Sequence, residues 1–266
     1  MPTVIELKKI ARELGLMGFS QFRKSQLEQL IFKAQKTEKS SNIKQLIIIT
    51  TPHEFCKRSS QETHTCDPFA IKLANQLVHS LKDDSREIIL FHGNIYRKLI
   101  DLNRAQSRET NFRKMIRNKL EDQIKKLLNS NSNSNRKNKI IYLLDCHSFR
   151  GNSFANIRIQ NPDVSVLFNC HQLLLLEELT ESLRDNGIIA TKHIGGKNDI
   201  IIEADSLNIK YELWRKNIIV IPLLIEVNEN ISDQKLTLVG KSINQWIHNV
   251  NNFLNLREPI KIELWK

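Results

Sequence analysis

Three apolar segments of this chain end in side chains that can bind a metal ion or carry a proton. The segment IIITTPHE delivers His53 and Glu54, and the segment IIYLLDCHS delivers Asp145 and His147. The segment IIVIPLLIEVN places Glu226 close to its end. Imidazole and carboxylate groups are common ligands of Zn²⁺, and a carboxylate beside the ion can act as a general base. Two histidines and a carboxylate at these positions therefore predict a divalent metal site with a base next to it.

A fourth polar cluster, DLNR at Asp101 to Arg104, follows the apolar run Ile88–Phe91. The Arg104 guanidinium can clamp a carboxylate or stabilise an oxyanion. Each residue taken alone has a plainer interpretation, such as a hydrogen-bonded loop histidine for His53 or a solvated charge for Arg104. The shared position of these groups at the ends of apolar segments favours a functional site.

The chain from residue 45 onward alternates between apolar runs of strand length and segments with helical periodicity. The predicted strands are Gln45–Thr50, Ile88–Phe91, Ile140–Leu144, Val164–Phe168 and Ile218–Glu226. The predicted helices are Pro68–Leu81, Asn111–Leu128, Gln172–Asp185, Ser206–Lys216 and Asp233–Leu254. This alternation predicts an α/β fold with a mixed, largely parallel sheet and helices on both faces. Functional side chains in such sheets usually lie just beyond the carboxyl ends of the strands, where the groups named above are found.

The first forty residues predict a small two-helix module. Thr3 with Glu6, and Ser25 with Glu28, have capping-box spacing, and apolar residues recur after each pair with helical periodicity. The basic residues that can contact nucleic acid are Lys8, Lys9, Arg12, Arg23 and Lys24. The segment VIELKKIARELGLMGFSQFRKSQLEQLI resembles the SAP and Rho-N-terminal class of helix–extended–helix modules, which implies DNA or RNA binding through phosphates. The alternative is a helical hairpin that docks on the main domain or on another protein.

Composition and polarity along the chain predict its domains, the charge of its partners and its location. We expect the helical module at residues 1–36, a polar linker at 37–42 and one α/β domain at 43–266. The formal charge of +11 favours anionic partners. No apolar stretch approaches the ~18–20 residues of a membrane span, and the N-terminus is too polar for a signal peptide. We therefore expect a soluble, intracellular protein, cytoplasmic or nucleic-acid-associated, with no membrane partner and with reduced cysteines.

The order of the motifs in the main domain resembles a known enzyme family. TPHE, CDPFA, DLNR, LLDCHS, HIGGKND and LIEVN follow one another over roughly residues 43 to 255. In this order they resemble the N-formylglutamate amidohydrolase family, which belongs to the wider zinc-carboxypeptidase-like group. DLNR and DCHS carry most of the resemblance.

The resemblance implies roles for individual residues. His53 and His147 would be metal ligands, Glu226 would be the general base, and Arg104 would anchor the substrate. Asn103 would assist that anchoring, and the turn at Gly195 and Gly196 would shape the pocket wall.

The third metal ligand stays open within this resemblance. The carboxypeptidase-type spacing, with glutamate three residues after the first histidine, is absent because Cys56 occupies that position. The candidates are Asp67, Glu62, Cys56 and Glu54. Asp67 is favoured because it precedes the predicted helix, where an N-cap residue belongs.

Together these features predict a zinc-dependent hydrolase of C–N (amide-type) bonds. Its substrate would be a small N-acyl amino acid or a peptide-like molecule, and the N-terminal module would tether it to nucleic acid. The alternative is a catalytically inactive hydrolase-like domain within a nucleic-acid-associated binding protein, which the missing histidine–glutamate spacing favours.

Overall fold

The structure is a computed structural model, which describes residues 3–13, 19, 22–37, 45–54, 66–95, 97, 101–102, 109–129, 139–156, 158–168, 173–194 and 199–256. Within these ranges, no helix is both long enough and apolar enough to cross a membrane. The predicted linker residues 38–42 fall outside the described ranges.

A pair of helices, α1 (Val4–Glu13) and α2 (Lys24–Thr37), forms the N-terminal module. The predicted capping box at α1 is confirmed, because the Thr3 N–H donates to Glu6 Oε2 (2.7 Å) and the Glu6 N–H donates to Thr3 Oγ1 (3.2 Å). The second predicted capping box is wrong. α2 begins at Lys24, so Ser25 lies inside the helix and is not its N-cap, and the Arg23 N–H donates instead to the Gln26 side chain (2.9 Å).

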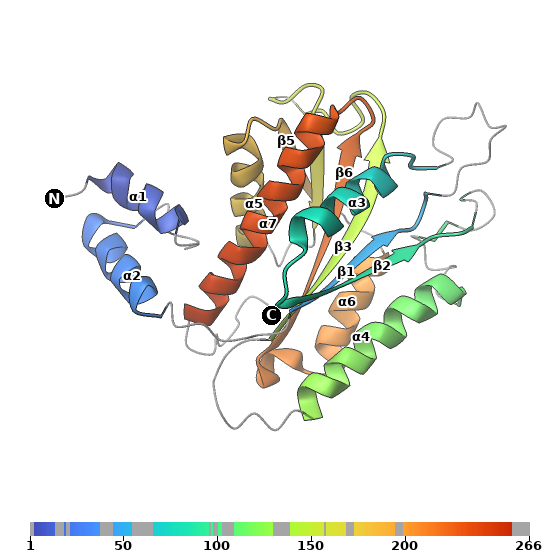
Figure 1. The fold of residues 1–266 in the computed structure, drawn as a ribbon, viewed down its shortest axis with the longest axis horizontal. Coiled ribbons are helices and arrows are strands. Elements are labelled where there is room, and N and C mark those ends of the chain that lie inside the picture. The colour runs from blue at the N-terminus through green and yellow to red at the C-terminus, as the bar shows by residue number, and fades with distance from the viewer. Residues whose placement is uncertain are drawn as a thin grey trace.

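The small module has an apolar centre of its own. Buried side chains from both helices and from the segment between them meet there and exclude water, namely Leu7, Ala11, Phe19, Leu27 and Ile31. Burial of this kind supplies most of the stability of short helices, which are marginal when isolated. α2 also contacts the long C-terminal helix α7 (Asp233–Leu256), so the module lies beside the main domain (Figure 1).

The main domain is built on a six-stranded sheet in the order β2-β1-β3-β6-β4-β5. Its strands are β1 (Gln45–Thr51), β2 (Arg86–His92), β3 (Lys139–Phe149), β4 (Val164–Phe168), β5 (Ala190–Ile194) and β6 (Ile218–Asn228). β2, β1, β3 and β6 run parallel, while β4 pairs antiparallel with β6 and parallel with β5. The prediction of a mixed, largely parallel sheet is therefore confirmed. The carboxyl ends of β1, β3 and β6 lie at one edge, which brings their terminal side chains together.

Helices cover both faces of the sheet, as predicted (Figure 1). One face packs against α3 (Ala70–Leu81), α5 (Leu173–Asp185) and α7. The other packs against α4 (Asn111–Asn129) and α6 (Asp199–Lys210). All seven residues of β1 are buried, which explains why this strand is apolar on both of its faces.

Two elements differ from the sequence prediction. The predicted helix Ser206–Lys216 is instead α6, which ends at Lys210, followed by a short 3₁₀ turn at Leu213–Lys216. Left-handed backbone at Glu212 (φ 45°) and Asn217 (φ 54°) separates the turn from its neighbours, and an α-helix cannot continue through such residues. The strand β5 has no counterpart among the predicted strands, because its sequence ATKHI carries only a short and partly polar pattern.

Candidate metal centre

His53 lies in a tight turn at the carboxyl end of β1. The last β1 residue, Thr51, pairs with His92 of β2, and the Gly93 N–H then donates to the Thr51 carbonyl (2.9 Å). A Cβ atom at Gly93 would lie 2.1 Å from the Pro52 carbonyl oxygen. Only glycine permits this approach, which holds the turn carrying His53 against the end of β2.

Asp67 is fixed beside His53 by the backbone. Its N–H donates to the His53 carbonyl (2.8 Å), and the carboxyl group is buried. α3 begins three residues later at Ala70, with Phe69 as N-cap residue and no side chain capping the helix. The expected N-cap role of Asp67 is therefore wrong, and the reason is that its carboxylate turns toward the histidines.

His147 is presented by β3, on the face that α4 and α6 cover. Asp145 precedes it by two residues, so both side chains point to the same face of the strand. The Asp145 carboxylate lies 3.1 Å from His147 Nε2 and accepts a hydrogen bond from the Thr50 hydroxyl of β1 (2.5 Å). All three side chains are buried.

The two imidazoles share one arrangement around Asp67. Asp67 Oδ2 lies 2.7 Å from His147 Nδ1 and 3.4 Å from His53 Nδ1. Each opposite nitrogen, Nε2, is held by another carboxylate, that of Asp145 for His147 and that of Asp101 for His53 (2.8 Å). A metal-binding histidine typically has its second nitrogen held in this way by a carboxylate.

The donor atoms fit a divalent metal ion. One ligand atom from each of His53, Asp67 and His147 lies within 4.8 Å of the other two. His53 Nδ1 is buried and forms no hydrogen bond with the described residues, although Asp67 Oδ2 lies 3.4 Å away. An unsatisfied buried nitrogen is costly, and a bound cation would satisfy it. Two nitrogens and one carboxylate oxygen match the protein donor set of catalytic zinc sites.

The ionisable groups of this centre shift one another's pKa values. Burial alone would raise the pKa of Asp67, but the adjacent His147 and His53 outweigh it and hold that pKa well below its usual range. Burial would lower the pKa of His147, but the Asp145 and Asp67 carboxylates raise it well above the ordinary value. His147 is therefore protonated near neutral pH without a metal ion, and a cation that binds there must displace this proton.

Glu226 lies beside His147, one of the three candidate ligands. It pairs in register with His147 across β6 and β3, so both side chains point to the same face. Burial is the largest cause of a pKa raised to about 7, which the nearby positive charge of His147 opposes. A carboxyl group that titrates near neutral pH can both accept and donate a proton, which is the property a general base requires.

The structure gives a place in the centre to two residues to which the sequence assigns no individual role. Arg97 places Nη1 3.6 Å from Asp67 Oδ1 and Nε 3.5 Å from Asp101 Oδ2, so it bridges two carboxylates of the centre. Asp101 belongs to the DLNR motif, yet its contact with His53 spans 48 positions of sequence and has no local signal. Only the pairing of Asp145 with His147 could be inferred from strand periodicity.

Glu54 is not placed to act as the third ligand. Its carboxylate accepts a hydrogen bond from Thr51 (2.6 Å) and lies 2.7 Å from His92 Nδ1, so it is directed toward β2. Two further candidates for that ligand, Glu62 and Cys56, fall outside the described residues. The predicted substrate-binding residues also lie outside them, namely Asn103, Arg104, Gly195 and Gly196.

The expectation of reduced cysteines is wrong for one residue. Cys66, directly before Asp67, is disulfide-bonded, whereas Cys146 is a buried free thiol. Irregular spacing along the chain says little about which cysteines approach each other in space.

The basic residues predicted to contact nucleic acid lie on the N-terminal helix pair. Lys9, Arg12 and Arg23 are exposed, whereas Lys8 and Lys24 are partly buried. Arg12 Nη1 lies 3.8 Å from Asp185 Oδ2 at the end of α5, so one of these charges faces the main domain.

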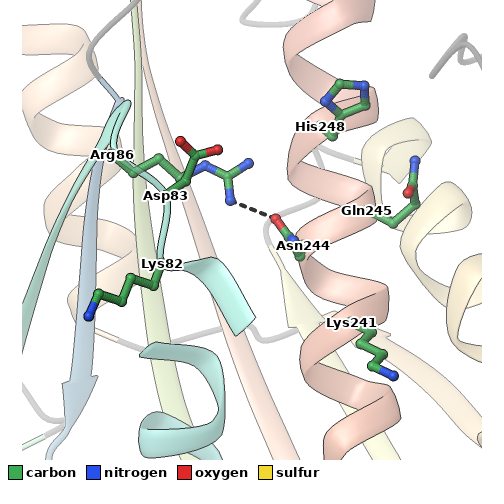
Figure 2. A pocket seen from close by; sticks show the side chains of 7 residues that line it. All are labelled: Lys82, Asp83, Arg86, Lys241, Asn244, Gln245 and His248. Atoms are coloured by element: carbon green, nitrogen blue, oxygen red, sulfur yellow. Dashed lines mark hydrogen bonds between the residues drawn. The ribbon is translucent and has the colours of Figure 1, made fainter. Parts of the chain in front are cut away.

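A separate hollow of about 520 Å³ lies between the end of α3, the start of β2 and α7 (Figure 2). Its lining residues are Lys82, Asp83, Arg86, Lys241, Asn244, Gln245 and His248. Within it, Arg86 donates a hydrogen bond to the Asn244 side chain (2.6 Å) and another to the Leu81 carbonyl (3.3 Å) at the end of α3. The Arg86 guanidinium thus ties β2 to both helices, and none of the predicted site residues lines this hollow.

No protein-family model matches the sequence, and no curated protein matches it. Among solved structures, a gene product of Agrobacterium tumefaciens is similar at 11% identity, covering 78% of this chain and 90% of that chain, with a TM-score of 0.46. The N-acetylmuramoyl-L-alanine amidase of Clostridium difficile 630 is similar at 10% identity, covering 78% and 96%, with a TM-score of 0.43. The pyrrolidone carboxyl peptidase of Thermococcus litoralis is similar at 11% identity, covering 82% and 99%, with a TM-score of 0.42. Similarities this distant assign no activity to this chain.

Proposed function

We propose that this protein is a zinc-dependent hydrolase of amide-type C–N bonds that acts on small N-acyl amino acids or peptide-like molecules. One observation carries the proposal. Two buried histidines direct Nδ1 toward one aspartate, while Asp101 and Asp145 hold their opposite nitrogens. Structural ion pairs do not require carboxylates on both nitrogens of each imidazole, whereas this arrangement is typical of histidines that bind a metal.

The residues that would hold the ion are His53, Asp67 and His147. When bound, Zn²⁺ supplies positive charge that lowers the pKa of water and polarises a carbonyl group. The protein fixes the direction of each ligand before binding, since Asp145 and Asp101 prevent the imidazoles from rotating away. This preorganisation is typical of catalytic centres.

Glu226 has the position and the acidity for proton transfer. Its carboxylate would take the proton of the attacking water and donate it to the leaving amine, as a general base and then a general acid. Its partial burial supports this role, because it is the largest cause of a pKa raised to about 7. Arg97, partly exposed and 3.6 Å from Asp67, holds the carboxylates in place by its charge.

The proposal is tested by hydrolysis of a panel of N-acyl amino acids with zinc-loaded protein. Glu226→Gln keeps the size of the side chain but removes its ability to take a proton. We expect the variant to fold, to keep its zinc, and to lose about 10²–10⁴-fold in hydrolysis rate. Loss of zinc would make Glu226 a ligand, and full activity would place the base elsewhere, with Glu54 next.

We further propose, as expected from the sequence, that the N-terminal helix pair contacts the phosphates of DNA or RNA. The exposure of Lys9 and Arg23 supports this, since neither side chain is needed for packing within the module. If zinc binds but no N-acyl compound is hydrolysed, the second candidate function, a nucleic-acid-associated binding protein, takes the place of the first.

A further inference from the structure

A row of polar side chains continues from the metal centre across the sheet. Ser165 of β4 pairs in register with Glu226 of β6 and with Thr191 of β5, and Glu226 pairs with His147. Paired residues of neighbouring strands point to the same face, so the four side chains lie in one line. Strands are about 4.8 Å apart, which places the Ser165 hydroxyl one strand from Glu226 and Thr191 two strands away.

Both hydroxyls in this row are buried and have no partner in the part of the chain that the structure describes. Ser165 and Thr191 have no exposed surface, and neither hydroxyl forms a hydrogen bond with any described residue. A buried polar group that lacks a partner costs stability, and native structures contain few of them. Two such groups in one line beside the candidate base are therefore unusual.

The two strands pack against the core through their opposite face, which does not include these hydroxyls. There Val164, Val166 and Ala190 join the core formed with α5 and α7. Burying hydroxyls without hydrogen bonds in a core costs stability. The same hydroxyls on a buried sheet face can bind a polar ligand.

Aromatic rings lie at the edge of this polar face. Phe154, from the loop after β3, contacts Phe149 (ring centroids 5.0 Å apart) and His193 of β5 (5.3 Å). His193 Nε2 lies 3.2 Å from the Phe154 carbonyl oxygen, which ties the loop to β5. Polar groups on the floor and rings at the edge match the general composition of a small-molecule site.

We propose that Ser165 and Thr191 form a substrate subsite next to Glu226, in which both hydroxyls bind a carbonyl or carboxylate oxygen of the substrate. This inference rests on the proposed function, since it extends that site toward β5. The rings of Phe154 and His193 would contact the apolar part of the same substrate. Side-chain rearrangement on binding, which is common, would open the closed face.

The experiment compares Ser165→Ala and Thr191→Val with the zinc-loaded wild type. The matched control is Thr180→Val, because the buried Thr180 hydroxyl has a partner and donates to the Leu176 carbonyl (2.9 Å). Affinity for N-acetyl-L-alanine is read from the rise in Tm with ligand concentration, with each protein also carrying Glu226→Gln so that the ligand is not consumed. Zinc content and hydrolysis are measured in parallel.

Removing a hydroxyl without a partner should raise the Tm of the ligand-free protein by about 2–4 °C for each variant. The same variants should bind N-acetyl-L-alanine about 5–10-fold more weakly with unchanged zinc content. The Thr180→Val control should show neither effect.

Two results would overturn the subsite. A fall in Tm for both variants would mean that the hydroxyls hold structural water, and unchanged affinity in both would remove them from substrate binding. Wild-type protein that binds N-acetyl-L-alanine without hydrolysing it, with weaker binding in both variants, would instead support the subsite and refute the proposed hydrolysis. If the wild type does not bind N-acetyl-L-alanine at all, N-acyl amino acids are not the ligands of this subsite and the proposal is refuted.

Discussion

Replacing Glu226 by glutamine should make the metal-free protein more stable at alkaline pH. The pKa of Glu226 is raised from 4.5 to about 7, chiefly because the carboxyl group is buried. A group whose pKa is higher in the folded state stabilises the fold below its unfolded pKa, and this contribution is lost as pH rises through the folded value. The wild type therefore loses stability between about pH 4.5 and 7 that the uncharged glutamine variant keeps.

The size of the effect follows from the two pKa values. The interval from 4.5 to about 7, at about 1.36 kcal/mol per pKa unit, corresponds to roughly 3 kcal/mol. Glutamine has nearly the same volume as glutamate and cannot ionise. The stability of the variant therefore has no contribution from ionisation at this position. We expect the variant to match the wild type near pH 4.5 and to exceed it by up to about 3 kcal/mol at pH 8.

The assay is urea denaturation of chelator-treated protein at pH 4.5 and pH 8, with midpoints compared at constant m. Glu177→Gln is the matched control, because that carboxylate is a half-exposed partner of Lys192 (2.8 Å) and should contribute about 0–1 kcal/mol at either pH. Equal stability of wild type and Glu226→Gln at pH 8 would refute the reasoning, since the carboxylate would then be solvated or compensated. Such a result would also remove the basis for its role as a neutral-pH base.

Three further predictions concern the ligands and the module. Asp101→Asn and Asp145→Asn should each weaken zinc binding about 10–100-fold in competition with a chelating dye, and unchanged affinity would remove both from ligand orientation. Burial opposes the raised pKa of His147 but the neighbouring carboxylates outweigh it, so zinc binding should weaken as pH falls and release about one proton by calorimetry. Binding that does not depend on pH would place the ion elsewhere. Deletion of residues 1–40 should abolish salt-sensitive binding of an oligonucleotide, and unchanged affinity would assign that binding to the main domain.

The sheet can be predicted from sequence because its inner strands are buried on both faces. β1, β3 and β6 are continuous apolar runs, and no helix or loop pattern competes with them. β5 is not predicted because two of its five residues, Thr191 and His193, face the polar row rather than a core. The end of α6 is misplaced because a left-handed residue at Glu212 has no signal in hydrophobic periodicity.

The site is predictable only where strands carry it. His53, His147 and Glu226 follow or end apolar segments, so strand geometry brings them to one edge of the sheet. Asp67 and Asp101 come from loops whose course depends on tertiary contacts, among them the bond from the Asp67 N–H to the His53 carbonyl. The hydroxyls beside Glu226, which have no partner among the described residues, have no sequence signal, because an ordinary serine in a strand gives the same pattern.

The measurement that tests the metal centre most directly is the zinc content of the purified protein. Protein prepared in zinc-supplemented, chelator-free buffer should hold about one zinc ion per chain, measured by atomic emission. His147→Ala should abolish this zinc while circular dichroism shows a retained fold, and His79→Ala, an exposed histidine on α3, should leave the zinc in place. Wild-type protein that remains metal-free under these conditions, or a His147→Ala variant that keeps its zinc, would contradict a metal site at His53, Asp67 and His147.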